Sequence, residues 1–158
     1  MDKNKEELLI HFEYSIDFVR KLGEISEELW RTPIAKDKWT VAEVVGHLSP
    51  WDEFLLKERL PYLFNETPMP KGPNEEEFNN QSAEVSRNSS REETILNFIN
   101  VRRNLIISIN NIDDELWSKE LKIGNHTLTI YEYMKGFVEH DLHHFEQINK
   151  VISAQSHL

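Results

Sequence analysis

The segment IYEYMKGFVEHDLHHFEQINKVI, residues 130–152, has the pattern of one long amphipathic helix. Its apolar positions recur at the helical period and share one face with a histidine: Ile130, Met134, Phe137, His144, Ile148, Val151 and Ile152. His140 precedes His144 by four residues, so the two imidazoles lie one turn apart on that face. Neutral imidazole nitrogens at this spacing can share one metal ion.

A third imidazole in a comparable setting lies in VAEVVGHL, residues 41–48. His47 again lies among apolar residues at helical spacing. We therefore expect a metal site between two helices, held by His47, His140 and His144. Histidines that only hydrogen-bond to neighbouring groups are the alternative, and for one residue alone that is the simpler interpretation. Three core-facing imidazoles would each cost desolvation without a partner, which favours the metal.

His143 is the competing ligand on the C-terminal helix. Relative to His140, His144 is displaced by about 40° around the helix and His143 by about 60° the other way, so both can reach a shared metal. His144 lies one turn before Ile148 on the core face and is preferred. We expect His143 on the flank, as a residue of the surrounding pocket.

Three neutral histidines leave coordination positions open for water or substrate, which is typical of a catalytic metal. Such a metal lowers the pKa of a bound water or thiol toward neutrality. One divalent ion is the expected cofactor. Zinc or nickel suits the nitrogen ligands, and manganese, iron or cobalt are the alternatives.

The rest of the chain predicts an all-α protein, a four-helix bundle. A first helix is expected from Lys5 to Leu29. The other three each open with a capping box, in which a hydroxyl residue is followed three positions later by glutamate. These pairs are Thr40 with Glu43, Ser90 with Glu93, and Thr129 with Glu132. The fourth helix should run to about Ala154 and leave His157 in a tail.

A long connection, residues 61–89, separates the second helix from the third and lets the two lie parallel. A short helix is expected inside it from Glu75 to Val85, with Phe78 and Asn79 pointing inward. In the second helix, Pro50 should cause a kink or a break.

Several polar residues allow two interpretations. Arg102 interrupts the apolar stripe of the third helix and is expected to reach solvent; otherwise it is a partly buried cation that holds a carboxylate. Glu43 is expected to cap its helix rather than to orient His47. His11 is expected at the surface or rim, and His126 at the tip of a turn or hairpin.

Composition narrows the function classes. A chain of 158 residues is expected to be one domain, residues 1–158, and its net charge of −10 argues against nucleic acid as a partner. No apolar run approaches transmembrane length, and no signal peptide is visible, so no membrane association is expected. The absence of cysteine excludes disulfides and a cysteine nucleophile and fits a cytoplasmic location.

Two segments of the sequence resemble the DinB/YfiT-like superfamily: WTVAEVVGHL, residues 39–48, and HDLHHFEQI, residues 140–148. The resemblance implies a four-helix bundle, often dimeric, with a divalent metal. By position, the ligands of that family fall on His47, His140 and His144. The family often has a Trp-Asn pair in the long connection, and here Phe78-Asn79 takes that place with the aromatic residue changed.

The resemblance leaves three functions open. The first is a thiol S-transferase of detoxification or stress response, using a small thiol such as bacillithiol; Asp52, Asn79 and His143 are then candidates for substrate contact or proton handling. The second is a metal-dependent hydrolase, which also needs a general base near the metal. The third is a stress protein that binds a metal or small ligand without catalysis. A small-molecule substrate and a homodimer are expected for the enzyme.

Overall fold

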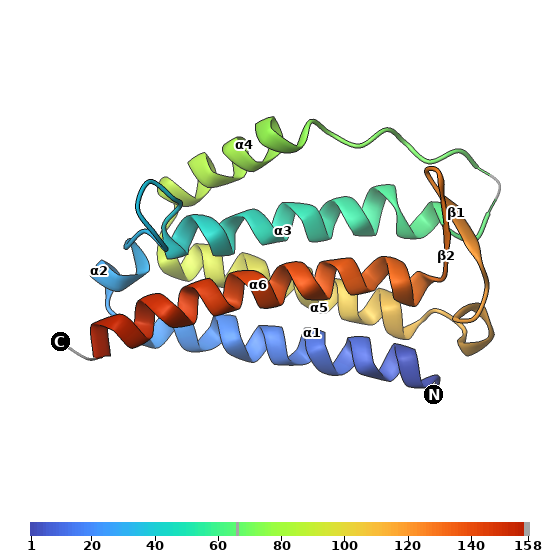
Figure 1. Cartoon of the computed structure of the whole chain (residues 1–158), viewed down its shortest axis with the longest axis horizontal. Coiled ribbons are helices and arrows are strands. Elements are labelled where there is room, and N and C mark those ends of the chain that lie inside the picture. Colours follow the sequence, from blue (N-terminus) through green and yellow to red (C-terminus); the bar gives the residue numbers. More distant parts are fainter. Residues whose placement is uncertain (66, 157–158) are drawn as a thin grey trace.

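The computed structural model describes residues 1–65 and 67–156, so the tail with His157 lies outside the described residues. Four long helices form the bundle, and these are α1 (Lys3–Lys21), α3 (Val41–Glu58), α5 (Arg91–Asn110) and α6 (Ile130–Ser156). The helices α3 and α5 run in one direction, and α1 and α6 run in the other (Figure 1). The predicted four-helix bundle and the parallel course of the second and third long helices are confirmed.

The first predicted helix is wrong in its extent. The helix α1 ends at Lys21 and is followed by a 3-10 turn, Leu22–Glu24, and the short α2, Glu27–Trp30. A new N-cap forms where the Ser26 side chain accepts a hydrogen bond from the Leu29 amide, after an extended residue, Ile25. Because a second short helix begins here, the helical apolar pattern continues beyond the end of α1.

The helix starts follow their caps. The capping boxes of Thr40 with Glu43 and of Ser90 with Glu93 are both present. Thr129 and Glu132 make the same reciprocal bonds at the start of α6. Glu43 also accepts a hydrogen bond from Arg87 at 2.6 Å and makes none to a histidine, which confirms its structural role.

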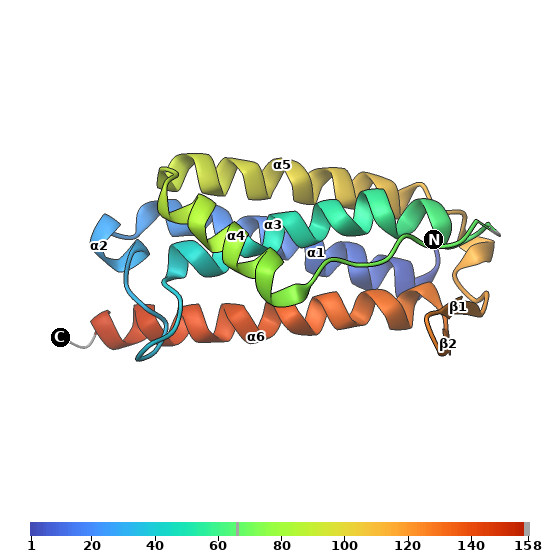
Figure 2. The same ribbon diagram turned by 90° about the horizontal axis from the view of Figure 1, so that it is seen from above.

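The expected short helix is α4, Glu75–Arg87, whose N-cap is Asn74. It crosses the outside of α3 after a linker that returns along the bundle (Figure 2). Gly46 permits this contact, because a Cβ there would lie 1.7 Å from Ser86 Oγ. The helix α3 continues through Pro50, so the predicted break does not occur.

The last connection holds a 3-10 turn, Asp114–Leu116, and a two-stranded antiparallel hairpin of β1 (Leu121–Ile123) and β2 (His126–Leu128). This confirms the expected hairpin. A further 3-10 turn, Leu60–Tyr62, follows α3. None of the helices in the described part of the chain is both long and apolar enough to cross a bilayer.

The main correction concerns Arg102, which was expected to reach solvent but is 1% exposed. Its guanidinium donates to Asp52 of α3 at 2.6 and 3.1 Å and to Asp141 of α6 at 2.6 and 3.3 Å. It also donates to Ser15 Oγ of α1 at 3.0 Å. His11, expected at the rim, is largely buried and lies 2.8 Å from Asp141 Oδ2. The partners come from other helices, and for this reason the stripe of α5 alone did not reveal them.

Candidate metal centre

Three histidines converge between α3 and α6. One ligand nitrogen from each of His47, His140 and His144 lies within 4.8 Å of the other two. The structure thus brings together the three residues that the sequence indicated. His47 is 2% exposed, His144 is half-buried and His140 is exposed, so the group has a buried floor and opens to solvent on the side of α6.

Hydrogen bonds fix the tautomers of two of these rings. His47 Nδ1 donates to the Val44 carbonyl, and His144 Nδ1 donates to Gln147 Oε1 at 2.7 Å. The Nε2 atoms of both rings therefore carry lone pairs, and His144 Nε2 lies 3.1 Å from His140 Nε2. Acceptors on the far nitrogen are the usual means by which proteins orient metal-binding imidazoles.

Burial favours the unprotonated form of all three rings. Burial lowers the pKa of His47 to about 3, against the hydrogen bond to Val44, which acts in the opposite direction. Burial also lowers the pKa values of His140 and His144. Three neutral imidazoles with their ligand nitrogens this close together fit a divalent metal and leave further coordination positions for another ligand.

A hollow of about 410 Å³ opens beside His140. It is lined by Trp51, Glu75, Asn79, Tyr133, Gly136, Phe137 and His140. Asn79 Oδ1 accepts a hydrogen bond from Trp51 Nε1 at 2.7 Å, so α3 and α4 are tied together at its wall. We call this the aromatic hollow.

Two further depressions lie beside the aromatic hollow and the histidines. One, of about 420 Å³, shares Glu75 and Asn79 with it and is also bounded by Trp39. The other, of about 290 Å³, shares Trp39 and includes His144 and Gln147. His140 and His144 therefore border these open depressions, and His47 lies buried beneath them.

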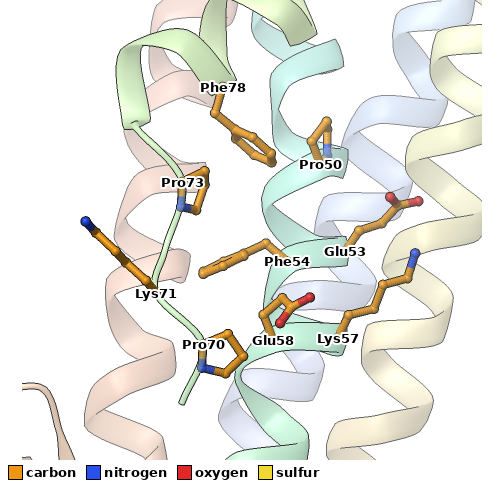
Figure 3. A pocket seen from close by; sticks show the side chains of 9 residues that line it. All are labelled: Pro50, Glu53, Phe54, Lys57, Glu58, Pro70, Lys71, Pro73 and Phe78. Carbon is orange, nitrogen blue, oxygen red and sulfur yellow. The ribbon is translucent and has the colours of Figure 1, made fainter. Parts of the chain in front are cut away.

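A larger cavity of about 530 Å³ lies elsewhere, between α3 and the linker (Figure 3). Its floor is formed by Pro50, Phe54 and Phe78, and Pro70 and Pro73 cover it from the linker. None of the three histidines lines it. Phe78 separates the two regions by packing on Trp51, with ring centroids 4.6 Å apart.

The other candidate residues lie at different depths. Asn79 lines the aromatic hollow, as expected of an inward group of the long connection. His143 is exposed on the flank of α6, and its ring centroid is 5.4 Å from that of His144. Asp52 lies in the core, where it forms an ion pair with Arg102. Asp52 therefore acts as a partner of Arg102 and does not face the histidines.

The buried ion pairs sit directly beside the histidines in sequence and link the helices that carry them. Asp141 follows His140, and Asp52 lies on the same helix as His47. Burial raises the pKa of Asp141, but Arg102 and His11 outweigh it and leave the pKa lowered. Asp52 lacks the histidine partner, and burial raises its pKa to about 6 against the effect of Arg102.

Sequence reasoning missed Gln147 and most of the aromatic hollow. Gln147 lies three residues after His144, one turn along the same helix. Tyr133, Gly136 and Phe137 lie seven, four and three residues before His140. These helical spacings place all three on the His140 side of α6, and this signal was available.

Comparison with solved structures supports the fold. The protein described as "YfiT from Bacillus subtilis", a probable metal-dependent hydrolase with an unusual four-helix bundle topology, matches with a TM-score of 0.79 at 17% identity, covering 99% of this chain and 90% of that one. The mycothiol-dependent maleylpyruvate isomerase matches with a TM-score of 0.67 at 15% identity, covering 91% of this chain and 60% of that one. The colibactin self-resistance protein ClbS, solved with double-stranded DNA, matches with a TM-score of 0.67 at 17% identity, covering 93% and 94%.

No curated protein matches the sequence significantly. The family comparison is decisive, because the model of the DinB superfamily matches residues 16–148, a span that includes all three histidines. By this match, and with the same bundle in its structure, the chain belongs to the DinB superfamily.

Proposed function

We propose that the protein is a metal-dependent enzyme that transfers a small thiol, of the bacillithiol type, to an electrophilic carbon of an organic molecule. The observation that carries the proposal is the convergence of three unprotonated imidazole nitrogens at the edge of the aromatic hollow. A divalent metal held by His47, His140 and His144 would lower the pKa of a thiol toward neutrality. Such a transfer suits detoxification or a stress response.

The side chains around the site supply the remaining needs of this reaction. The thiol loses its proton, its sulfur lone pair forms the new C–S bond, and the leaving group departs with the electrons of the broken bond. Glu75 lines the hollow and is placed to accept the thiol proton. Exposed His143 offers a path for that proton to solvent. Asn79, held by Trp51, orients the acceptor molecule.

The test is product formation by zinc- or nickel-loaded protein with bacillithiol, mycothiol or glutathione and 1-chloro-2,4-dinitrobenzene. We expect turnover above the uncatalysed rate with at least one thiol, and none in the His47→Ala protein. His126→Ala is the matched control, because His126 lies in the hairpin, outside the histidine group. Absence of turnover by fully loaded protein with every thiol, across several acceptors, would contradict the proposal.

A hydrolase is the second candidate, and Glu75 is the observation that favours it. Hydrolysis requires a general base near the reacting water, and Glu75 is a carboxylate that lines the hollow beside His140. The likeness to the probable hydrolase YfiT points the same way. A panel of esters and amides, assayed with loaded and chelated protein, separates the two functions. In a hydrolase, Glu75→Gln should remove nearly all turnover.

Duplex DNA is not the proposed partner, although ClbS was solved with it. The net charge of −10 opposes a phosphate backbone, and the aromatic hollow adds the carboxylate of Glu75 to that field. A gel-shift assay at low salt should show no complex, and ClbS serves as the positive control.

A further inference from the structure

The walls of the aromatic hollow are rigid rings. Trp51 is fixed by its hydrogen bond to Asn79 and packs on Phe54 and Phe78 with centroids 5.7 and 4.6 Å apart. On α6, Tyr133 and Phe137 pack edge to face at 5.7 Å. Aromatic faces carry partial negative charge and favour planar or cationic groups.

The space between these walls exists because position 136 is glycine. An added Cβ on Gly136 would meet no heavy atom within 4 Å, although the residue lines the hollow. The volume of about 410 Å³ lies within the usual range for small-molecule sites. A larger side chain at this position would project into the space where a ligand lies.

The described residues that line the hollow include a negatively charged side chain but no lysine or arginine. The charged side chain is that of Glu75. Glu75 makes no ion pair within the described part of the chain. Its charge reaches His140, whose pKa it raises slightly against the larger effect of burial.

Arg59 is the cation at the Tyr133 end of the hollow. Burial raises the pKa of Tyr133, and the charge of Arg59 and its hydrogen bond to the Tyr133 side chain act in the opposite direction. Its guanidinium is already engaged. It donates to the carbonyls of Glu58 and Pro70 at 2.7 and 2.8 Å, and it lies 4.5 Å above the Phe54 ring. Arg59 thus holds the linker and does not line the hollow.

We propose that the aromatic hollow binds a planar aromatic group that is neutral or positively charged, and that it rejects anionic aromatics. The rings of Trp51, Tyr133 and Phe137 stack against the ligand, and Glu75 attracts a positive substituent. A carboxylate on the ligand would face Glu75, with no lysine or arginine among the described lining residues to pair with. The Asn79 amide, whose oxygen is used by Trp51, keeps its N–H groups for an acceptor atom of the ligand.

Within the proposed function, on which this role rests, the ligand is the electrophilic acceptor of the thiol. Binding in the hollow itself does not need the metal, because only His140 belongs to both sites. The two proposals can therefore fail separately.

The test uses three probes that share one ring system and differ in charge: 2-naphthylmethylamine, 2-naphthalenemethanol and 2-naphthoate. Each is titrated by calorimetry into the full chain, with and without chelator. We expect the amine to bind about tenfold more tightly than the naphthoate, and the alcohol to fall between them. Preference for the naphthoate, or no binding of any probe, would overturn the proposal.

Three variants locate the binding. Gly136→Leu should abolish binding of all three probes, while Lys135→Leu, at the exposed neighbouring position, should leave it unchanged. Glu75→Gln should remove the difference in affinity between the amine and the naphthoate but leave the affinity for the alcohol unchanged. Binding that survives Gly136→Leu would place the ligand elsewhere. Amine binding by a protein without thiol turnover would instead contradict only the proposed function.

Discussion

Two polar clusters lie between α3 and α6, and they differ in how their groups are satisfied. In the first, His47, His140 and His144 are neutral and direct nitrogen atoms at one another. In the second, Arg102 meets Asp52 and Asp141 with short, charged hydrogen bonds. The arginine cluster is satisfied by partners from three other helices, whereas the outer hydrogen bonds of His47 and His144 leave their Nε2 lone pairs facing the histidine cluster. The first cluster is therefore suited to an outside cation, and the second holds the helices of the bundle together.

The largest expected difference between the clusters is in metal binding. His47→Ala should abolish stoichiometric binding of zinc or nickel, because it removes the most buried of the three ligands and the one that α3 contributes. The fold should survive, since the helices keep their caps and core. Metal content and calorimetric titration measure the first effect, and far-ultraviolet circular dichroism the second. His126→Ala is the control and should bind one ion as the parent does.

Substitution of Arg102 should affect the free energy of unfolding most, as substitution of His47 should affect metal binding most. Arg102→Met leaves the buried Asp52 without its cation and Asp141 with His11 as its remaining partner, and loss of one partner from a buried pair costs about 3–5 kcal/mol. Arg103→Met, one residue further at an exposed position, should change the free energy of unfolding by less than about 0.5 kcal/mol. Urea denaturation of the chelated proteins makes the comparison. Equal effects of the two substitutions would show that the buried cluster contributes no net stability.

Acidification should change the stability contributions of the two clusters in opposite directions. The pKa of His47 is about 3 in the folded protein and about 6.5 in the unfolded chain, so only the unfolded chain takes up this proton between those values. Stability due to His47 is present above pH 6.5 and falls as the pH drops, by about 1.4 kcal/mol per pH unit. Asp52 has the opposite sign: its folded pKa of about 6 exceeds the unfolded one, so acidification from pH 6 to 4 relieves a cost.

Difference measurements isolate each residue in this pH prediction. The free energy of unfolding of the chelated parent minus that of His47→Gln should decrease between pH 6.5 and 4. The free energy of unfolding of the parent minus that of Asp52→Asn should increase as the pH is lowered from 6 to 4. Two differences that run in parallel would mean that the clusters do not titrate as separate units.

The comparison also shows which features a sequence can reveal. The i, i+4 spacing of His140 and His144 and the apolar setting of His47 are local patterns, and they indicated the histidine group. The capping boxes gave the starts of three long helices for the same reason. From the sequence, burial of Arg102 against a carboxylate is only the alternative to solvent exposure, and Asp52 and Asp141 are not identified as the partners, because all three look like ordinary interruptions of their separate stripes. Only the packing of the helices shows that the three interruptions coincide.

Errors elsewhere have similar causes. The helix pattern ran on past Lys21, and only the Ser26 cap distinguishes a second short helix from a continuation. The aromatic hollow needed Trp51 and α4 beside α6, which is a tertiary arrangement.

The smallest expected effects come from two glycines beside the histidine cluster. Gly46 precedes His47, and a Cβ there would overlap Ser86 of α4 at 1.7 Å. Gly46→Ala should therefore push α4 outward and cost about 1–3 kcal/mol, even though alanine favours a helix. Gly136→Ala meets nothing within 4 Å and should stabilise α6 by up to about 1 kcal/mol.

These two substitutions test whether α4 is held over the cluster by this contact. Thermal unfolding gives both signs, and the indole fluorescence of Trp51, whose Nε1 donates to Asn79 of α4, reports its displacement. A Gly46→Ala protein with unchanged stability would mean that α4 is not held in place by this close contact, since rotation of Ser86 moves its Oγ but not its Cβ, 2.8 Å from the added atom. Because α4 carries Asn79 and Glu75, an outward shift should also weaken probe binding in the hollow, while metal binding by His47, His140 and His144 persists.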